Sequence, residues 1–353
     1  MAATAPAQDW EIFRGDPALT GVATGTLPDA PVPIWSFEAG DAIESGPAIA
    51  GDTVYVTSLD GKLYALALAD GSLRWAYDAG EEIKSSPSVR GASVYFGDEA
   101  GIFHAVDVGT GKARWTFLAD GAITASANFF EDVVLFGSYD QFLYALSAQD
   151  GSLVWKLETA SYVNATPAVA GGDTFVSGCD GVFRRVRLRD GVETLALEVG
   201  GVMAGSAAIA GDRAYVGTMD HQVLAIDLEA GKVAWRYEDP EQAFPFYSSP
   251  ALTGDLVFLG GRDKRLHAID AESGERRWAF ETRAKIDASP VVVGDRVLLA
   301  STSGRIYALD RRTGTPTWEF DAGSGLVGTP AVGRGHLVVG TADGLVVAFG
   351  AKS

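Results

Sequence analysis

Cysteine, clustered positive charge and long apolar runs are what this sequence has little of. Cys179 is the one cysteine among 353 residues, which excludes an intrachain disulfide and a zinc site made of cysteines. Acidic residues outnumber Lys and Arg by 46 to 28, giving a formal net charge of −18. A surface that binds phosphates needs clustered Lys and Arg, so neither nucleic acid nor a broad anionic lipid surface is an expected partner.

Membrane and targeting signals are also missing. No apolar run approaches the ~18 residues that suggest a transmembrane helix, so direct membrane insertion is not expected. The opening residues, MAATAPAQDWEIF, have neither the basic nor the apolar region of a signal peptide, and no lipid-acceptor cysteine. We expect a soluble chain that is cytoplasmic as written, or periplasmic or in the cell envelope of a bacterium if an export signal has been removed.

Catalytic motifs are absent as well. The sequence contains no H-E-x-x-H, no G-x-S-x-G and no phosphate-binding loop. No catalytic residues and no enzyme activity are predicted from it.

What the sequence does contain is a repeat marked by tryptophan. Four tryptophans stand 40 residues apart, and three more continue the series after one slip of three residues: Trp35, Trp75, Trp115, Trp155, Trp235, Trp278 and Trp318. Leu195 occupies the one missing position. A fixed period of about 40 residues is typical of repeat architectures, in which each unit buries its apolar face against its neighbours.

Each repeat has the pattern of four short strands. In residues 46–77, β-rich runs alternate with Gly and Asp turn signals. One turn position is acidic in most repeats, and an aspartate that caps a hairpin turn explains it: Asp60, Asp140, Asp180, Asp220, Asp263 and Asp343, with Ala100 and Ser303 in the other two.

Counting the repeats predicts the architecture. Eight third strands are present, but the chain stops after the eighth, without a fourth strand for that unit. The segment 33–37 is a fourth strand with nothing before it, so it completes the last unit and closes the ring. We predict an all-β, eight-bladed β-propeller of four-stranded antiparallel blades over 33–349, with a lead-in segment at 1–32 and a tail at 350–353.

The repeat pattern S-S-P, V-Y-x-G, D-G-x-L-Y-A-L and T/D-G-x-x-x-W resembles that of the quinoprotein propellers, named after pyrroloquinoline quinone (PQQ) enzymes; Ser85 to Trp115 is one example. The opening Trp10 to Asp16 also looks like the lead-in of short, BamB-like members. The resemblance implies that each in-register tryptophan docks against the neighbouring blade. It also makes the contact between blades four and five, which has Leu195, the weakest of the ring.

Candidate binding residues stand where the repeats differ. Before each inner strand, one position is apolar in every repeat and the next one varies: Glu44, Lys84, Thr124, Asn164, Ala204, Tyr247, Asp287 and Val327. We expect the apolar positions to pack and the varied ones to surround the mouth of a central channel. Glu44, Lys84, Asn164, Tyr247 and Asp287 are therefore channel-mouth candidates for binding.

Three of these residues have side-chain oxygens that suit calcium: Glu44, Asn164 and Asp287. The resemblance implies such a site beside the quinone, with Lys84 near the quinone. The chain is, however, about half as long as the large dehydrogenases, and it lacks the vicinal cysteines of most alcohol-oxidising members. We therefore predict no cofactor and no metal, with PQQ and calcium as the alternative.

Two further features interrupt the repeat. The largest insertion, residues 239–247, brings Phe244 and Phe246 beside Tyr247, either to contact a ligand or to fold back onto the blades. In blade four, Arg185, Arg187 and Arg189 share one strand face and form a candidate partner surface, unless they pair with local acids. His104 and His267 take a position held elsewhere by Tyr, which indicates packing between blades.

The resemblance to short members without the dehydrogenase residues implies a non-enzymatic scaffold. We expect a monomer that binds a protein or peptide partner through the loops of one face. A propeller that senses a small ligand and a PQQ-dependent oxidoreductase are the alternatives.

Overall fold

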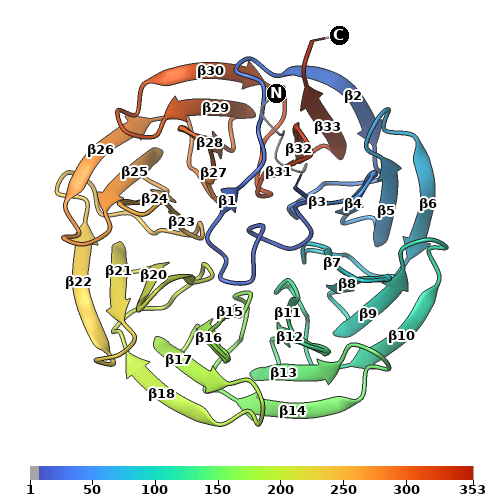
Figure 1. The fold of residues 1–353 in the computed structure, drawn as a ribbon, viewed down its shortest axis with the longest axis horizontal. Coiled ribbons are helices and arrows are strands. Elements are labelled where there is room, and N and C mark those ends of the chain that lie inside the picture. Colours follow the sequence, from blue (N-terminus) through green and yellow to red (C-terminus); the bar gives the residue numbers. More distant parts are fainter. Residues whose placement is uncertain (1–7, 353) are drawn as a thin grey trace, which may run out of the picture.

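The computed structural model describes residues 8–352 and shows eight four-stranded blades around a central axis (Figure 1). Within these residues every regular element is a strand. Blades one to seven each follow the chain from the axis outwards, and the strands of every blade are antiparallel. The predicted eight-bladed propeller is confirmed.

The blades repeat one pattern of strand lengths. Blade one consists of β3 (Ala48–Ala50), β4 (Thr53–Thr57), β5 (Lys62–Ala67) and β6 (Leu73–Asp78). Blades two to four are β7 (Ser88–Arg90), β8 (Ser93–Gly97), β9 (Ile102–Asp107) and β10 (Ala113–Leu118); β11 (Asn128–Phe130), β12 (Val133–Gly137), β13 (Phe142–Ser147) and β14 (Leu153–Glu158); β15 (Ala168–Ala170), β16 (Asp173–Ser177), β17 (Val182–Arg187) and β18 (Glu193–Glu198).

The second half continues it. Blades five to seven are β19 (Ala208–Ala210), β20 (Arg213–Gly217), β21 (Gln222–Asp227) and β22 (Lys232–Glu238); β23 (Ala251–Leu252), β24 (Leu256–Gly260), β25 (Arg265–Asp270) and β26 (Arg276–Glu281); β27 (Val291–Val293), β28 (Arg296–Ala300), β29 (Arg305–Asp310) and β30 (Pro316–Asp321). Blade eight contains β31 (Ala331–Gly333), β32 (His336–Gly340) and β33 (Leu345–Gly350).

The ring is closed by the start of the chain. Strand β2 (Val32–Glu38) pairs antiparallel with β33 and forms the outer strand of blade eight, with Phe37 opposite Val346. The prediction of a closing strand at 33–37 is therefore confirmed, and the strand is one residue longer at each end. This closing strand gives blade eight the same four strands as the other blades.

Tryptophans hold neighbouring blades together. The Trp35 indole donates a hydrogen bond of 2.7 Å to the Leu68 carbonyl, and its ring covers Gly71, where a Cβ would approach within 2.6 Å. Gly71 has a φ of +72°, so the turn and the contact both require glycine. Five more tryptophans repeat the bond from one blade to the next: Trp75, Trp115, Trp155, Trp235 and Trp278. Trp318 packs edge-on against Phe349 in blade eight.

The blade that lacks the tryptophan has a substitute donor. Leu195 lies over Gly231, and its strand neighbour Arg185 donates a hydrogen bond of 3.2 Å to the Leu228 carbonyl. Leu228 is the position that accepts an indole hydrogen bond in the other blade contacts. Blades four and five thus keep the polar bond and lose the apolar area of the indole.

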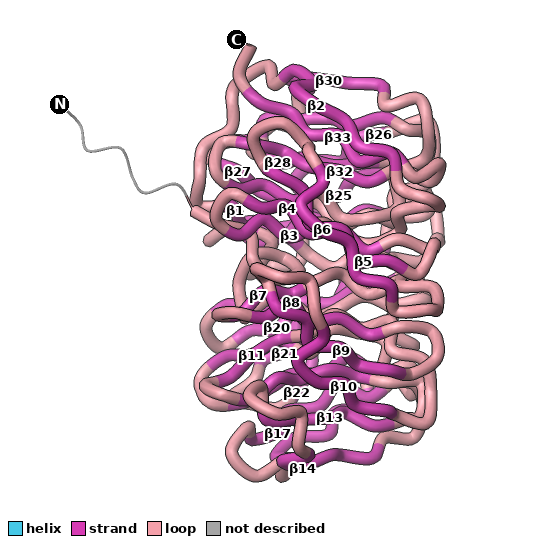
Figure 2. The backbone as a smooth tube through the Cα atoms, turned by 90° about the vertical axis from the view of Figure 1, so that its right-hand side faces the viewer, coloured by secondary structure: helices cyan, strands magenta, loops and turns pink. Residues whose placement is uncertain are grey.

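The lead-in segment crosses one end of the channel, which the sequence did not indicate (Figures 1 and 2). Its carbonyls accept hydrogen bonds from the inner strands of six blades, at Ile49, Val89, Val169, Ile209, Leu252 and Val292. In blade three the Asn128 side chain donates to the Pro17 carbonyl at 2.8 Å. A short strand, β1 (Val22–Ala23), then joins β27 in parallel. Within the described residues, the inner strands other than β27 have no further strand on their channel side, so the lead-in carbonyls accept hydrogen bonds from backbone N–H groups that would otherwise have no partner in the blade.

Candidate functional site

A central channel collects the varied positions of the eight repeats. Each belongs to the loop between an outer strand and the next inner strand. All eight line one cavity of about 180 Å³, together with Phe13 of the lead-in: Glu44, Lys84, Thr124, Asn164, Ala204, Tyr247, Asp287 and Val327. The structure thus brings all five channel-mouth candidates together around one polar opening.

The apolar positions next to them form the packed base of the loops. Ile43, Ile83, Ile123, Val163, Met203, Phe246, Ile286 and Leu326 are at most 1% exposed. The prediction that the apolar positions pack and the varied positions surround the channel is therefore confirmed.

A ring of hydroxyl groups, which the sequence analysis missed, encircles the channel below its mouth. At every step of the ring except the one from Thr329 to Gly46, a backbone N–H donates to the hydroxyl of the next blade, as from Ser86 to Ser126 at 3.1 Å and from Ser206 to Ser249 at 3.0 Å. The full set is Ser86, Ser126, Thr166, Ser206, Ser249, Ser289 and Thr329, with Gly46 in the eighth place. A Ser or Thr before the Pro position, repeated with the tryptophan period, was the available signal.

Asp287 is held by two cations at the mouth. Its Oδ1 accepts from Arg262 Nε at 2.9 Å, and its Oδ2 lies 2.6 Å from Lys285 Nζ. The Arg262 guanidinium also stacks on the Tyr247 ring at 3.5 Å. Arg262 is the functional side chain that sequence reasoning overlooked here, because its position in the repeat is a turn. These contacts hold Tyr247 and Asp287 in defined positions in the channel wall.

This environment does not fit calcium or PQQ. A calcium ion at Asp287 would have to displace Arg262 and Lys285 from both carboxylate oxygens. The cavity of about 180 Å³ is also smaller than the roughly 300–1,000 Å³ of ordinary ligand pockets. Glu44, Asn164 and Asp287 line the channel, but the arrangement at Asp287 argues against the calcium alternative.

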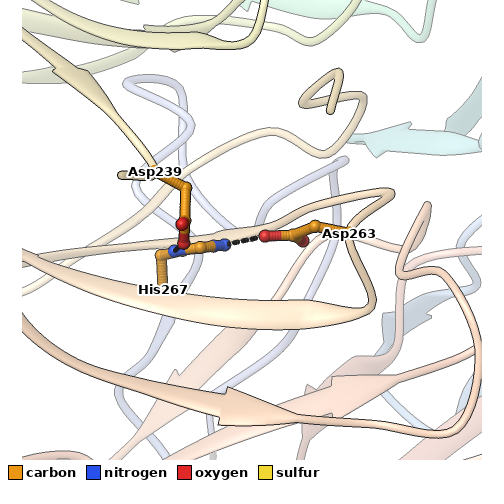
Figure 3. Close-up of side chains that lie close together, drawn as sticks. All are labelled: Asp239, Asp263 and His267. Atoms are coloured by element: carbon orange, nitrogen blue, oxygen red, sulfur yellow. Dashed lines mark hydrogen bonds and ion pairs between the residues drawn. The ribbon is translucent and has the colours of Figure 1, made fainter. Parts of the chain in front are cut away.

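Within residues 8–352, Asp239, Asp263 and His267 form the one group of acidic and histidine side chains close enough to suggest a metal site (Figure 3). His267 Nε2 lies 2.7 Å from Asp263, whereas its Nδ1 lies 3.6 Å from Asp239. The two carboxylates therefore approach opposite sides of the ring. Arg276 Nη1 also contacts Asp239 at 3.1 Å. These contacts describe a buried ion-pair network rather than a shell of ligands around one ion.

The network has a counterpart in blade two. His104 is bonded to Asp98 at 2.9 Å and shares a hydrogen bond with Tyr77 of blade one at 3.1 Å. In blade six, His267 likewise shares a bond of 3.0 Å with Tyr237 of blade five. The predicted packing role of both histidines between blades is thus confirmed. In blade two the turn position that Asp263 holds in blade six is Ala100, which has no carboxylate. Asp98, two residues earlier, supplies the carboxylate that bonds His104 instead.

The two aromatic-loop candidates have different environments. Phe246 is 1% exposed and packs edge-on against His267, so of the two alternatives for this residue the structure shows folding back onto the blades and excludes contact with a ligand. Phe244 is 45% exposed. The β12–β13 turn and the β14–β15 loop expose a further pair that the sequence analysis missed. Tyr139 and Tyr162 stack with ring centroids 4.9 Å apart and are 37% and 50% exposed.

The arginine candidates pair with local acids. Arg187 and Arg189 lie 2.7 Å and 3.4 Å from the same carboxylate, Asp190, and Arg185 bonds Leu228 as described above. These residues lie toward the β17–β18 turn, at the opposite end of the blade from the channel-mouth loops. The arginine strip and the exposed tyrosines therefore belong to different faces of the molecule.

On the lead-in face, a groove of about 700 Å³ lies beside β1. It is lined mainly by small and apolar side chains, among them Val22, Leu252 and Val292, with Arg311 also in its wall. No helix within the described residues is long and apolar enough to cross a membrane.

Comparison with known proteins places the repeat in a family. The family model described as outer membrane protein assembly factor BamB matches residues 30–130, 121–238, 190–284 and 262–353. The crystal structure of BamB from Moraxella catarrhalis is similar, with 19% identity over 92% of this chain and 98% of that chain and a TM-score of 0.78. No curated protein sequence matches the chain.

Enzymes and a designed protein share the same architecture. Quinohemoprotein alcohol dehydrogenase from Comamonas testosteroni has 14% identity over 100% of this chain and 82% of that chain, with a TM-score of 0.85. The computationally designed Ika8 protein has 18% identity over 90% and 99%, with a TM-score of 0.80. At these identities the likeness establishes the fold alone, because one fold can host unrelated functions.

Proposed function

The chain belongs to the family of outer membrane protein assembly factor BamB, and we propose from this that it is a non-enzymatic scaffold binding a protein partner. The partner binds on the face that carries the channel mouth, over blades three to six. The family description refers to outer membrane protein assembly, so we further propose that this chain works in the cell envelope.

The exposed stack of Tyr139 on Tyr162 is the observation that carries this proposal. The two rings come from separate loops and hold each other at an interplanar angle of 12°. Exposed aromatic rings are the commonest anchors of protein interfaces, and a pre-stacked pair loses little side-chain freedom when a partner covers it. Phe244 is a separate exposed aromatic side chain on the channel-side loop before blade six.

The charge around these rings indicates the chemistry of the partner. Asp120 and Glu158 are exposed at the ends of β10 and β14, and the chain as a whole has a formal charge of −18. We infer a partner surface with an apolar centre and a basic rim, because complementary charge orients and speeds association.

Catalysis is not proposed for the channel. Asp287, one of the three calcium candidates of the quinone alternative, is bonded to Arg262 and Lys285. The channel is also too small for an organic cofactor of ordinary size.

A crosslinking experiment in cells tests the proposal. A photoreactive residue at Tyr162 is expected to capture one discrete protein, identified by mass spectrometry as a component of outer membrane assembly. The same residue at Leu153, which is 49% exposed on the outer strand β14, is the matched control and should capture none. The double variant Tyr139→Ser with Tyr162→Ser should lose the partner and keep its thermal midpoint. Equal capture at both sites, or full recovery by the double variant, would rule out this surface.

A further inference from the structure

The seven ring hydroxyls present donors to the channel. Each oxygen accepts a backbone N–H of the previous blade, as Ser206 does from Thr166 at 2.9 Å, which leaves its own proton to donate. The ring residues are 4–7% exposed, and all seven line the cavity. The channel wall therefore presents a converging set of hydrogen-bond donors, each more than nine-tenths buried.

A buried cation lies behind this wall. Arg14 of the lead-in is 0% exposed, and its Nη2 donates to the Pro250 carbonyl at 2.8 Å. Its Nε and Nη1 have no acceptor within residues 8–352. Pro250 directly follows the ring residue Ser249, and Phe13, the neighbour of Arg14, lines the channel. The guanidinium thus bonds the chain one residue after the hydroxyl ring, although Arg14 is not itself among the residues that line the channel.

No fixed carboxylate neutralises this charge at close range. Asp16 acts on Arg14 through space, but its own carboxylate accepts hydrogen bonds from Thr20. Burial lowers the pKa of Arg14 to about 9, so the group is still a cation at neutral pH. Buried charges in proteins are normally compensated, and the polar channel lined by the neighbouring Phe13 offers both donors and space for a counter-charge.

The charged groups of the mouth do not supply that compensation. Asp287 is bonded to Arg262 and Lys285, and Lys84 lies 3.4 Å from Glu99. These pairs are satisfied among themselves at the outer rim. Glu44, the remaining acid of the mouth, is exposed to solvent, which screens its charge.

We propose that the channel binds a small oxyanion, such as sulfate, phosphate or a short carboxylate, between the hydroxyl ring and the field of Arg14. A volume of about 180 Å³ holds such an ion with a few waters, since one water takes roughly 30 Å³. A metal cation is disfavoured in the same place, because the hydroxyl oxygens already accept N–H groups and Arg14 repels positive charge. This site is independent of the partner surface proposed above.

A charge placed in the channel wall tests the site. Ala204 lines the channel, and Ala204→Asp adds a carboxylate that should repel the oxyanion, whereas Ala204→Asn adds the same volume without charge. Thermal midpoints are measured in sodium sulfate, phosphate or acetate against sodium chloride at equal ionic strength. For the wild-type chain we expect the best oxyanion to raise the midpoint by about 3 °C at a hundredfold excess over its dissociation constant.

The pattern across the variants decides the outcome. The shift should persist in Ala204→Asn and disappear in Ala204→Asp, while the ranking of the three anions identifies the preferred chemistry. An equal shift in both variants, or none in the wild-type chain, overturns the proposal. Should Ala204→Asp fail to fold, crystals of the wild-type chain soaked in selenate give the answer. An anomalous peak inside the hydroxyl ring supports the site, and a channel without one refutes it.

Discussion

Arg185 donates to the Leu228 carbonyl at 3.2 Å, at the same position where six tryptophans donate to the neighbouring blade. An arginine on the third strand thus substitutes for a missing indole on the fourth. The geometry gives Arg185 a structural role, and its place in a partner surface remains a prediction.

Removing Arg185 should weaken the contact between blades four and five. We expect Arg185→Ala to lower the free energy of unfolding by about 1 kcal/mol, because the Leu228 carbonyl loses its side-chain donor. Urea denaturation measures the loss. Arg187→Ala, which breaks only the ion pair with Asp190, is the control and should cost less. If Arg185→Ala with Leu195→Trp is no more stable than Arg185→Ala alone, the substitution argument is wrong.

Gly71 should tolerate no side chain. Gly71→Ala places a Cβ 2.6 Å from the Trp35 ring at a φ of +72°, so we expect a loss of about 2–4 kcal/mol. Gly91→Ala is the matched control, since its φ is +60° but no atom lies within 4 Å of the added Cβ. That variant isolates the backbone strain and should lose about 1 kcal/mol. Similar losses in the two variants would mean that the tryptophan contact contributes little.

The repeat explains why the architecture was predictable from the sequence. Trp35 and the strand around it stand in register with every later repeat, so the closing role of 33–37 followed from counting. The channel ring was located in the same way, because residues such as Asn164 and Asp287 occupy one position of a periodic pattern. Periodicity fixes the place of a residue, even where its neighbours are unknown.

Residues outside the period were not predictable. Arg14 and Phe13 belong to a segment without a repeat, and their position across the channel depends on carbonyls meeting six separate blades. Phe246 occupies the position of the buried apolar ring in its repeat. That position predicts its burial, whereas the aromatic residues beside it in the sequence suggested a binding loop. The stack of Tyr139 on Tyr162 joins two loops 23 residues apart in sequence, a contact that no local pattern encodes.

The lead-in should be a stabilising part of the propeller. Trp10 is 2% exposed, pairs through its backbone with Ile49 and covers Gly15. We expect Trp10→Ala to cost about 3–5 kcal/mol, because a large buried ring leaves a cavity. Chemical denaturation measures the loss, with the exposed Phe244→Ala as a control of small effect. A change below about 1 kcal/mol for Trp10→Ala would show that the segment is only loosely held.

Acid should remove a small contribution that Asp270 makes to stability. Hydrogen bonding from Arg277 lowers the pKa of Asp270 from 3.8 to about 2, with further bonds from Ser273 and Glu272. Because the pKa is lower in the folded chain, the stabilisation is complete above about pH 4 and is lost as the pH falls to about 2. The Arg277 side chain is 54% exposed, so screening by solvent limits the value of the pair to less than about 1 kcal/mol. Asp270→Asn should therefore be less stable than the wild-type chain at pH 6, and the difference should vanish near pH 2.

Urea denaturation at several pH values gives this comparison, with Asp212→Asn at an exposed turn as the control. A constant difference between Asp270→Asn and the wild-type chain from pH 6 to pH 2 would contradict the assignment. In that case Asp270 would stabilise the turn by accepting hydrogen bonds from Glu272 and Ser273, and its charge would contribute nothing. The amide oxygen of Asn would replace these hydrogen bonds only in part.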